Sequence, residues 1–99
     1  MNITKQLNDS ELLLTIEGSI DTLTAPELDK ELSNSLEGIT SLILDFTDVD
    51  YVSSAGLRVL LGVYKTMTTQ GKFVIRHVNP DVMEVFKMTG FDKFLTFED

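Results

Sequence analysis

The sequence predicts an α/β fold with a mixed β-sheet of about four to five strands and helices packed on it. Two apolar runs, residues 41–46 and 73–75, have the character of buried strands. The segments between and after them carry apolar residues at helical spacing. Strands separated by single helices imply right-handed crossovers and parallel neighbours, and an expected hairpin at the start adds an antiparallel strand.

The first two strands are expected at residues 1–6 and 12–17. Asn8, Asp9 and Ser10 supply the residues of a turn between them, which would make the pair a hairpin. Gly18 and Ser19 are expected to end the second strand, with the chain staying extended at Ile20.

The first helix is expected to start at Thr24. Thr24 and Glu27 have the spacing of a capping box, and Leu23 and Leu28 that of a hydrophobic staple. Pro26 lies in the first turn, where it removes no interior hydrogen bond. The apolar residues of this helix repeat every four positions: Leu28, Leu32 and Leu36. Gly38 is expected to stop it.

The strand at residues 41–46 shows no polar alternation before Asp45, so it is expected to be covered on both faces. A polar turn is expected at residues 47–50. A second helix is expected from near Ser53, with Gln70–Gly71 ending it.

The strand at residues 73–75 is followed by Asn79 and Pro80, a cap and a first-turn proline that predict a third helix. Thr89–Gly90 closes this helix, and residues 94–97 add a final short strand or a packed tail. There is no repeat, low-complexity stretch or linker, so residues 1–99 are expected to form one domain.

The composition and net charge of the chain make some functions less plausible than others. The chain of 99 residues has 8 basic and 16 acidic residues and a formal net charge of −8. This disfavours nucleic-acid binding and attachment to anionic membranes, and it favours a protein partner with a basic face. There is no cysteine, which excludes disulfides and thiolate zinc sites. Lacking a signal peptide pattern or a membrane-length apolar run, the protein is expected to be cytoplasmic, without direct membrane insertion.

Common enzyme motifs are missing, since there is no GxGxxG, Walker loop or GxSxG. We therefore expect no enzymatic activity and no cofactor. An acid–base site of Asp50 and His77 is kept only as a third alternative, because nothing in the sequence brings the two together. Asp45, Asp48 and Asp50 lack the spacing of a calcium loop, so they are interpreted as a solvated acidic rim and no metal site is expected.

Ser53 and Ser54 stand where a turn becomes a largely apolar helix. A serine there can simply cap the helix, which contributes about 1 kcal/mol. One hydroxyl could instead accept a phosphoryl group, held against free backbone amides at the positive end of the helix dipole. The spacing alone favours the cap but does not explain why two serines are present.

Four segments then point to a family. They are GSIDTLTAPEL at residues 18–28, LILDF at 42–46, YVSSAGLRVLL at 51–61 and VNPDVMEVFKMTGF at 78–91. In this order they resemble STAS domains, specifically bacterial anti-sigma factor antagonists, across nearly the entire chain. The resemblance implies a single STAS-like domain.

The resemblance also implies partner switching. An unmodified antagonist binds an anti-sigma factor with serine kinase activity and frees the sigma factor. Phosphorylation by that kinase releases the antagonist, and a PP2C-type phosphatase reverses the modification. Motif matching puts the acceptor at Ser54, with Ser53 as fallback, because many phosphorylated members have aspartate where this chain has Ser53. The implied partner-binding residues are Asp21, Thr22, Asp50, Ser53, Ser54, Gly56 and Leu57.

The main alternative keeps the fold and changes the role. A STAS protein can be a subunit of a lipid-transport ABC system or a non-phosphorylated scaffold, and neither role needs a serine hydroxyl.

Overall fold

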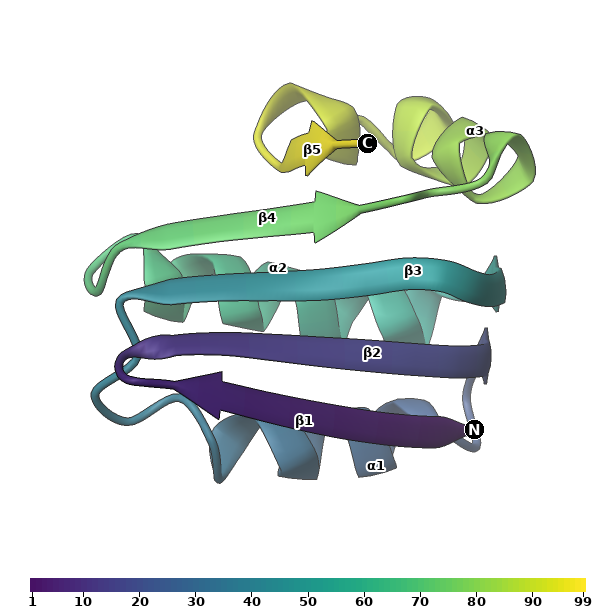
Figure 1. Cartoon of the computed structure of the whole chain (residues 1–99). Helices are drawn as coiled ribbons and strands as arrows, with labels where there is room; N and C mark the ends of the chain where they lie inside the picture. The colour runs from purple at the N-terminus through teal and green to yellow at the C-terminus, as the bar shows by residue number, and fades with distance from the viewer.

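The computed structural model describes residues 1–99 as a five-stranded sheet with three α-helices and a short 3₁₀ helix, η1 (Figure 1). The order along the sheet is β1-β2-β3-β4-β5, with β1 antiparallel to β2 and all other neighbours parallel. This confirms the predicted mixed sheet. The elements are β1 Asn2–Asn8, β2 Glu11–Ile20, α1 Ala25–Ser33, β3 Ser41–Val52, α2 Ser54–Met67, β4 Lys72–Arg76, α3 Pro80–Thr89, η1 Phe91–Lys93 and β5 Thr96–Glu98.

Helices α1 and α2 lie behind the sheet in Figure 1, and the face toward the viewer carries no helix. The prediction that residues 41–46 are covered on both faces is therefore wrong. Leu42 and Leu44 are fully buried, whereas Ile43 between them is only half-buried. Its neighbours in register, Leu13 and Val74, are also aliphatic. Because these three side chains shield one another across the strands, the open face tolerates an apolar centre.

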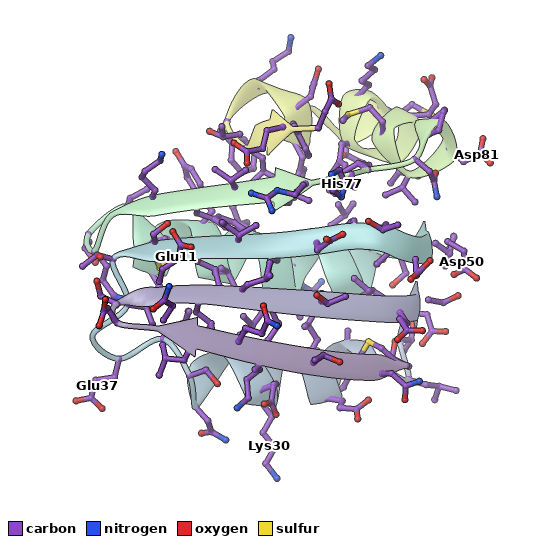
Figure 2. All side chains as sticks on the ribbon, viewed as in Figure 1. Glu11, Lys30, Glu37, Asp50, His77 and Asp81 are labelled. Atoms are coloured by element: carbon purple, nitrogen blue, oxygen red, sulfur yellow. The ribbon has the colours of Figure 1, made fainter.

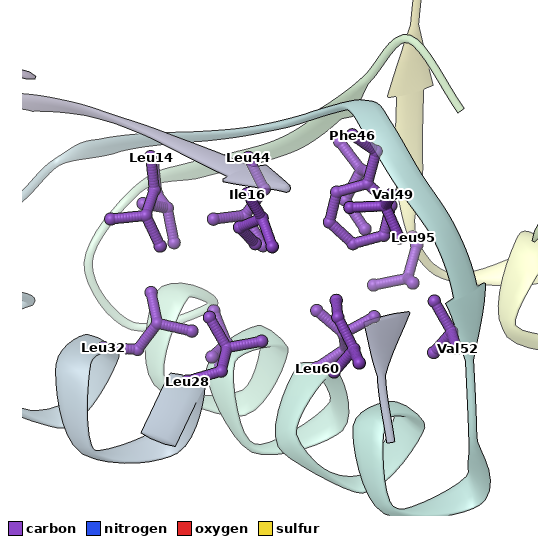
Figure 3. Close-up of a cluster of buried hydrophobic side chains, with 14 of the residues drawn as sticks. Leu14, Ile16, Leu28, Leu32, Leu44, Phe46, Val49, Val52, Leu60 and Leu95 are labelled. Atoms are coloured by element: carbon purple, nitrogen blue, oxygen red, sulfur yellow. The ribbon is translucent and has the colours of Figure 1, made fainter. Parts of the chain in front are cut away.

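The core fills the layer between the sheet and the helices. Figure 3 shows Leu14, Ile16 and Leu44 of the sheet facing Leu28 and Leu32 of α1. At the other end of the layer, the ring of Phe86 in α3 packs against the rings of Phe46 in β3 and Phe97 in β5, with centroid distances of 6.3 and 5.1 Å. The core thus joins all three helices to the sheet.

Strands β2 and β3 are longer than the sequence predicts. Gly18 and Ser19 continue β2, and residues 47–50 continue β3 instead of forming a turn. The two strands stay paired because register shifts, between Thr15 and Glu17 and between Gly18 and Ser19, absorb extra residues of β3. Gly18 has a φ of +107°, which favours glycine at this irregularity. As a result both strands end together, at Ile20 and Val52.

The start of α1 differs from the prediction. Thr24 and Glu27 form no capping box; Thr24 pairs with Asp21 instead. The Asp21 N–H donates to Thr24 Oγ1 (2.9 Å), and the Thr24 N–H donates to Asp21 Oδ1 (3.0 Å). This is the reciprocal pattern of a capping box, three residues earlier. Leu23 is 88% exposed, so the predicted staple with Leu28 is absent.

The end of α1 also comes earlier than predicted. The helix ends at Ser33, and Leu36 is buried from the following loop, ahead of Gly38. The Gln70 side chain, beyond the end of α2, donates to the carbonyls of Leu36 and Ile39 (both 2.8 Å). These bonds hold the loop in place without a further helical turn.

The later elements are closer to the predictions made from the sequence. Helix α2 begins next to Ser53 as expected, but it ends at Met67, ahead of Gln70–Gly71. Asn79 caps α3 as predicted, since its Oδ1 accepts from the Val82 N–H at 2.8 Å. Of the two expectations for residues 94–97, a short strand or a packed tail, the structure has the strand, β5, but it begins two residues later, at Thr96.

Candidate functional site

Helices α1 and α2 both begin at the sheet edge where β2 and β3 end. The Ser53 N–H donates to the Ile20 carbonyl (2.8 Å), which ties the start of α2 to the end of β2. Polar side chains gather at this edge, as expected where strand carboxyl ends meet helix amino ends. We call this surface the rim and define it by Ser19, Asp21, Thr22, Asp50, Ser53 and Ser54.

The two serines have different surroundings. Ser53 is half-buried and caps α2, because its Oγ accepts from the Gly56 N–H at 3.3 Å. Ser54 is the first residue of α2, is exposed, and its hydroxyl makes no hydrogen bond. The N–H groups of Ser54 and Ala55 also lack a backbone acceptor. The structure therefore separates one serine with a structural bond from one with a free hydroxyl.

Gly56 and Leu57 do not lie on the exposed surface. A β-carbon at Gly56 would lie 2.8 Å from Ile20 Cγ2 and 3.0 Å from Val52 Cγ1. Leu57 is 7% exposed and belongs to the core. Both residues were predicted to face a partner, but their position indicates that they seat α2 against the sheet and so orient the serines.

Asp50 joins the two strands at the rim. The Ser19 hydroxyl donates to Asp50 Oδ1 at 2.7 Å, across 31 residues of sequence. Figure 2 shows Asp50 at the strand ends, with His77 set back at the end of β4. Asp50 is exposed, so a partner can reach its carboxylate.

Asp21 is held by amide donors. Backbone hydrogen bonds from Thr24 and Leu23 and the Thr24 hydroxyl lower the pKa of the Asp21 carboxyl below its usual 3.8, against a smaller opposing effect of burial. Thr22, in the same turn, is exposed. Asp21 therefore contributes negative charge to the rim at neutral pH.

Two exposed apolar side chains that the sequence does not predict as surface residues lie beside the rim. Leu23 is 88% and Tyr51 is 52% exposed. Tyr51 is paired in register with Ser19, and Leu23 follows Thr22 in the chain. Both side chains are next to turn residues and aspartates in the sequence, which indicates exposure, but the staple spacing of Leu23 predicts burial instead. Together they give the acidic rim an apolar border.

His77 belongs to a separate cluster. Its Nδ1 lies 3.0 Å from the Thr47 hydroxyl and 3.5 Å from Asp45 Oδ1. Partial burial raises the pKa of Asp45, but hydrogen bonds from Thr47 and the charge of His77 outweigh it and lower the pKa below 3.8. Asp50 is hydrogen-bonded to Ser19 instead, so the structure does not pair Asp50 with His77.

The main surface hollows lie away from the rim. None of the four main surface hollows is lined by a rim residue. One of about 210 Å³ is lined by Tyr64, Phe73 and Phe94, near the start of β4. Small-molecule sites are usually concave, so the rim geometry suits a protein partner better. No three His, Cys, Asp or Glu side chains are grouped to hold a metal ion, and no helix has the length and apolar character to cross a membrane.

The fold and the rim define a class: a small α/β domain with helices on one sheet face and a serine-bearing helix start at the strand ends. The chain belongs to the STAS domain family, which it matches over residues 2–99.

Named relatives agree with this assignment. A Bordetella bronchiseptica protein, provisionally named anti-sigma factor antagonist BtrV, is 37% identical over 93 residues, covering 92% of this chain and 80% of the relative. The anti-sigma-B factor antagonist of Bacillus subtilis is 29% identical over 91 residues, covering 91% of this chain and 84% of the relative.

Solved structures share the fold. An anti-sigma factor antagonist from Mycobacterium paratuberculosis superposes with a TM-score of 0.87 at 23% identity, covering 97% of this chain and 83% of that one. The anti-sigma factor antagonist SpoIIAA in its unphosphorylated form gives 0.83 at 16% identity, covering 99% and 89%. SpoIIAA from Bacillus has also been solved in a phosphorylated form, with a TM-score of 0.75 at 15% identity, covering 99% and 92%.

Proposed function

We propose that this protein is an anti-sigma factor antagonist that works by partner switching, and that the switch is phosphorylation of Ser54. The observation that carries the proposal is the free, exposed Ser54 hydroxyl at the first position of α2, beside a serine already used as the cap. Relatives named as antagonists over most of the chain support the role. The existence of a phosphorylated form of SpoIIAA supports the mechanism.

In the unmodified state, the rim binds an anti-sigma factor with serine kinase activity, in the cytoplasm. The partner side would carry basic groups opposite Asp21 and Asp50, because opposite charges guide the encounter and fix its register. Leu23 and Tyr51 would supply the apolar contact area. The chain itself acts as the substrate of the kinase and not as an enzyme.

Phosphorylation would end the complex by charge and bulk. A phosphoryl group adds about −1.5 to −2 charge at neutral pH. At the start of α2 it fills the space that the partner occupies, and it repels partner carboxylates that face this part of the helix, away from the basic groups opposite Asp21 and Asp50. A PP2C-type phosphatase would restore the binding form.

The first test is the intact mass of the protein from its own cells, before and after phosphatase treatment, with the modified residue located by fragmentation. A phosphatase-sensitive group on Ser54 is expected. A group on Ser53 would move the acceptor and keep the mechanism. No phosphorylation in any growth condition would leave only the capping role of Ser53 and favour the scaffold or ABC-transporter subunit.

The second test is binding to the candidate kinase. Ser54→Ala should keep the affinity of the unmodified protein, whereas Ser54→Asp should bind poorly, because the carboxylate imitates part of the phosphoryl charge. Equal affinity of the two variants would contradict a charge switch.

A further inference from the structure

Arg58 lies one helical turn after Ser54 on α2, and both side chains are exposed. Residues four apart on a helix are neighbours on the same face, with β-carbons about 5–6 Å apart. The Arg58 guanidinium therefore has the reach to contact a group attached to the Ser54 oxygen.

Arg58 has no partner in the structure. The three close ion pairs join Lys5 to Glu31, Arg76 to Glu98, and His77 to Asp45. No hydrogen bond from the Arg58 side chain is formed either. It is thus an unmatched cation in a chain with a formal net charge of −8.

The nearby rim carboxylates already have donors. Asp50 accepts from the Ser19 hydroxyl, and Asp21 accepts from the amides of Leu23 and Thr24. These bonds fix both carboxylates within the rim. A new anion on Ser54 would therefore find Arg58 free.

Building on the function proposed above, we propose that Arg58 is the internal counter-ion of phosphorylated Ser54. The order is the favourable one for a helix, with the anion toward the amino end and the cation four residues later. A guanidinium can donate two parallel hydrogen bonds to phosphate oxygens, which a lysine cannot do in the same geometry. The unbonded N–H groups of Ser54 and Ala55 support the phosphate from the helix side.

The pairing changes what phosphorylation does to the surface. In the unmodified protein, Arg58 is a free cation that can meet a carboxylate of the partner. In the modified protein, the phosphate occupies Arg58. The switch then adds an anion and removes a cation from the same face of α2.

The test uses protein with phosphoserine installed at position 54 by genetic-code expansion, so it does not depend on any cellular kinase. The second pKa of the phosphoserine is measured by ³¹P NMR titration in wild type, Arg58→Gln, Arg58→Lys and Lys65→Gln. Lys65 is the matched control, because it is also exposed and unpaired on α2 but lies too far along the helix from Ser54.

Arg58→Gln is expected to raise the phosphoserine pKa by at least about 0.2 pH units, since the guanidinium favours the dianion. The phosphoserine pKa of Arg58→Lys should lie between those of the wild type and Arg58→Gln, and that of Lys65→Gln should match the wild type. The difference should shrink at 1 M salt, as expected of an exposed ion pair. Equal pKa values in wild type and Arg58→Gln would overturn the pairing. A cell-derived protein without phosphate would instead count against the proposed function, so the two failures are distinguishable.

Discussion

Gly56 of α2 and Ile20 of β2 are in such close contact that a β-carbon on the glycine would lie 2.8 Å from Ile20 Cγ2 and 3.0 Å from the Ile20 carbonyl oxygen. This approach sets the depth at which α2 sits on the sheet and hence the height of Ser54 at the rim. We expect Gly56→Ala to lower the free energy of unfolding by about 1–3 kcal/mol, the cost of overpacking a buried contact. Urea unfolding measures it.

Gly62 gives the matched control on the same helix. A β-carbon there would meet nothing within 4 Å, and Gly62 is exposed. Gly62→Ala should raise stability by up to about 1 kcal/mol, because alanine restricts the unfolded chain. If Gly56→Ala and Gly62→Ala changed the free energy of unfolding equally, the tight contact at Gly56 would not be the cause of the change.

The two serines should differ in stability as well as in function. Ser53→Ala removes the cap of α2 and should cost about 1 kcal/mol. Ser54→Ala removes an exposed hydroxyl without a bond and should stay within about 0.5 kcal/mol of wild type. Thermal unfolding of the pair checks this, and the reverse order would mean that Ser54 is the cap.

The Thr24 hydroxyl links the end of β2 to the start of α1. It accepts from the Asp21 N–H and donates to the Ser19 carbonyl at 2.7 Å. Thr24→Val keeps the shape and removes these bonds together with the contact of the hydroxyl to Asp21 Oδ1 at 3.1 Å, so it should destabilise the fold by about 1–2 kcal/mol. Thr22→Val is the control, because Thr22 is exposed and makes no side-chain hydrogen bond. An unchanged midpoint in Thr24→Val would contradict the bridging role.

Asp45 should make the stability of the fold depend on pH in the acidic range. Its pKa in the folded protein is below the ordinary 3.8, so its contribution is present above that value and is lost as the pH falls through the folded pKa. Asp45→Asn should flatten the loss of stability below about pH 4. Asp48→Asn is the control, because its carboxylate accepts no hydrogen bond. Urea unfolding midpoints are measured between pH 2 and 7 for the wild type, Asp45→Asn and Asp48→Asn. If all three proteins lost stability equally at low pH, the prediction would be refuted.

Leu23 tests the docking surface. Because its side chain is 88% exposed, Leu23→Ser should leave unfolding nearly unchanged. If the rim binds the anti-sigma factor, the same change should weaken the complex by about tenfold, the loss of one apolar contact residue. Calorimetric titration measures it, with Leu7→Ser as control, since Leu7 is 67% exposed in β1, away from the rim. Equal effects of both changes would place the partner elsewhere.

Features that depend on a few neighbouring residues could be predicted from the sequence. The sequence predicts Asn79 as a cap and a serine cap at the helix that starts near Ser53, because a side-chain oxygen three residues before a free amide can accept a hydrogen bond from it. The alternation of strands and helices was recognisable from the spacing of apolar residues. The position of Ser54 at a helix start followed from the same local chemistry.

Features that depend on distant partners needed the three-dimensional arrangement. Asp21 and Thr24 have the same spacing as Thr24 and Glu27, and either pair fits a capping box. The structure forms the Asp21–Thr24 pair. It is favoured because the Thr24 hydroxyl also bonds to the Ser19 carbonyl at the end of β2. The local sequence of residues 47–50 predicts a turn, but parallel pairing with β2 keeps these residues extended in β3. This pairing brings Asp50 within hydrogen-bond distance of Ser19. Local patterns report propensities and caps. Strand pairing and close contacts between elements decide which of those patterns is used, because their energies come from residues far apart in the chain.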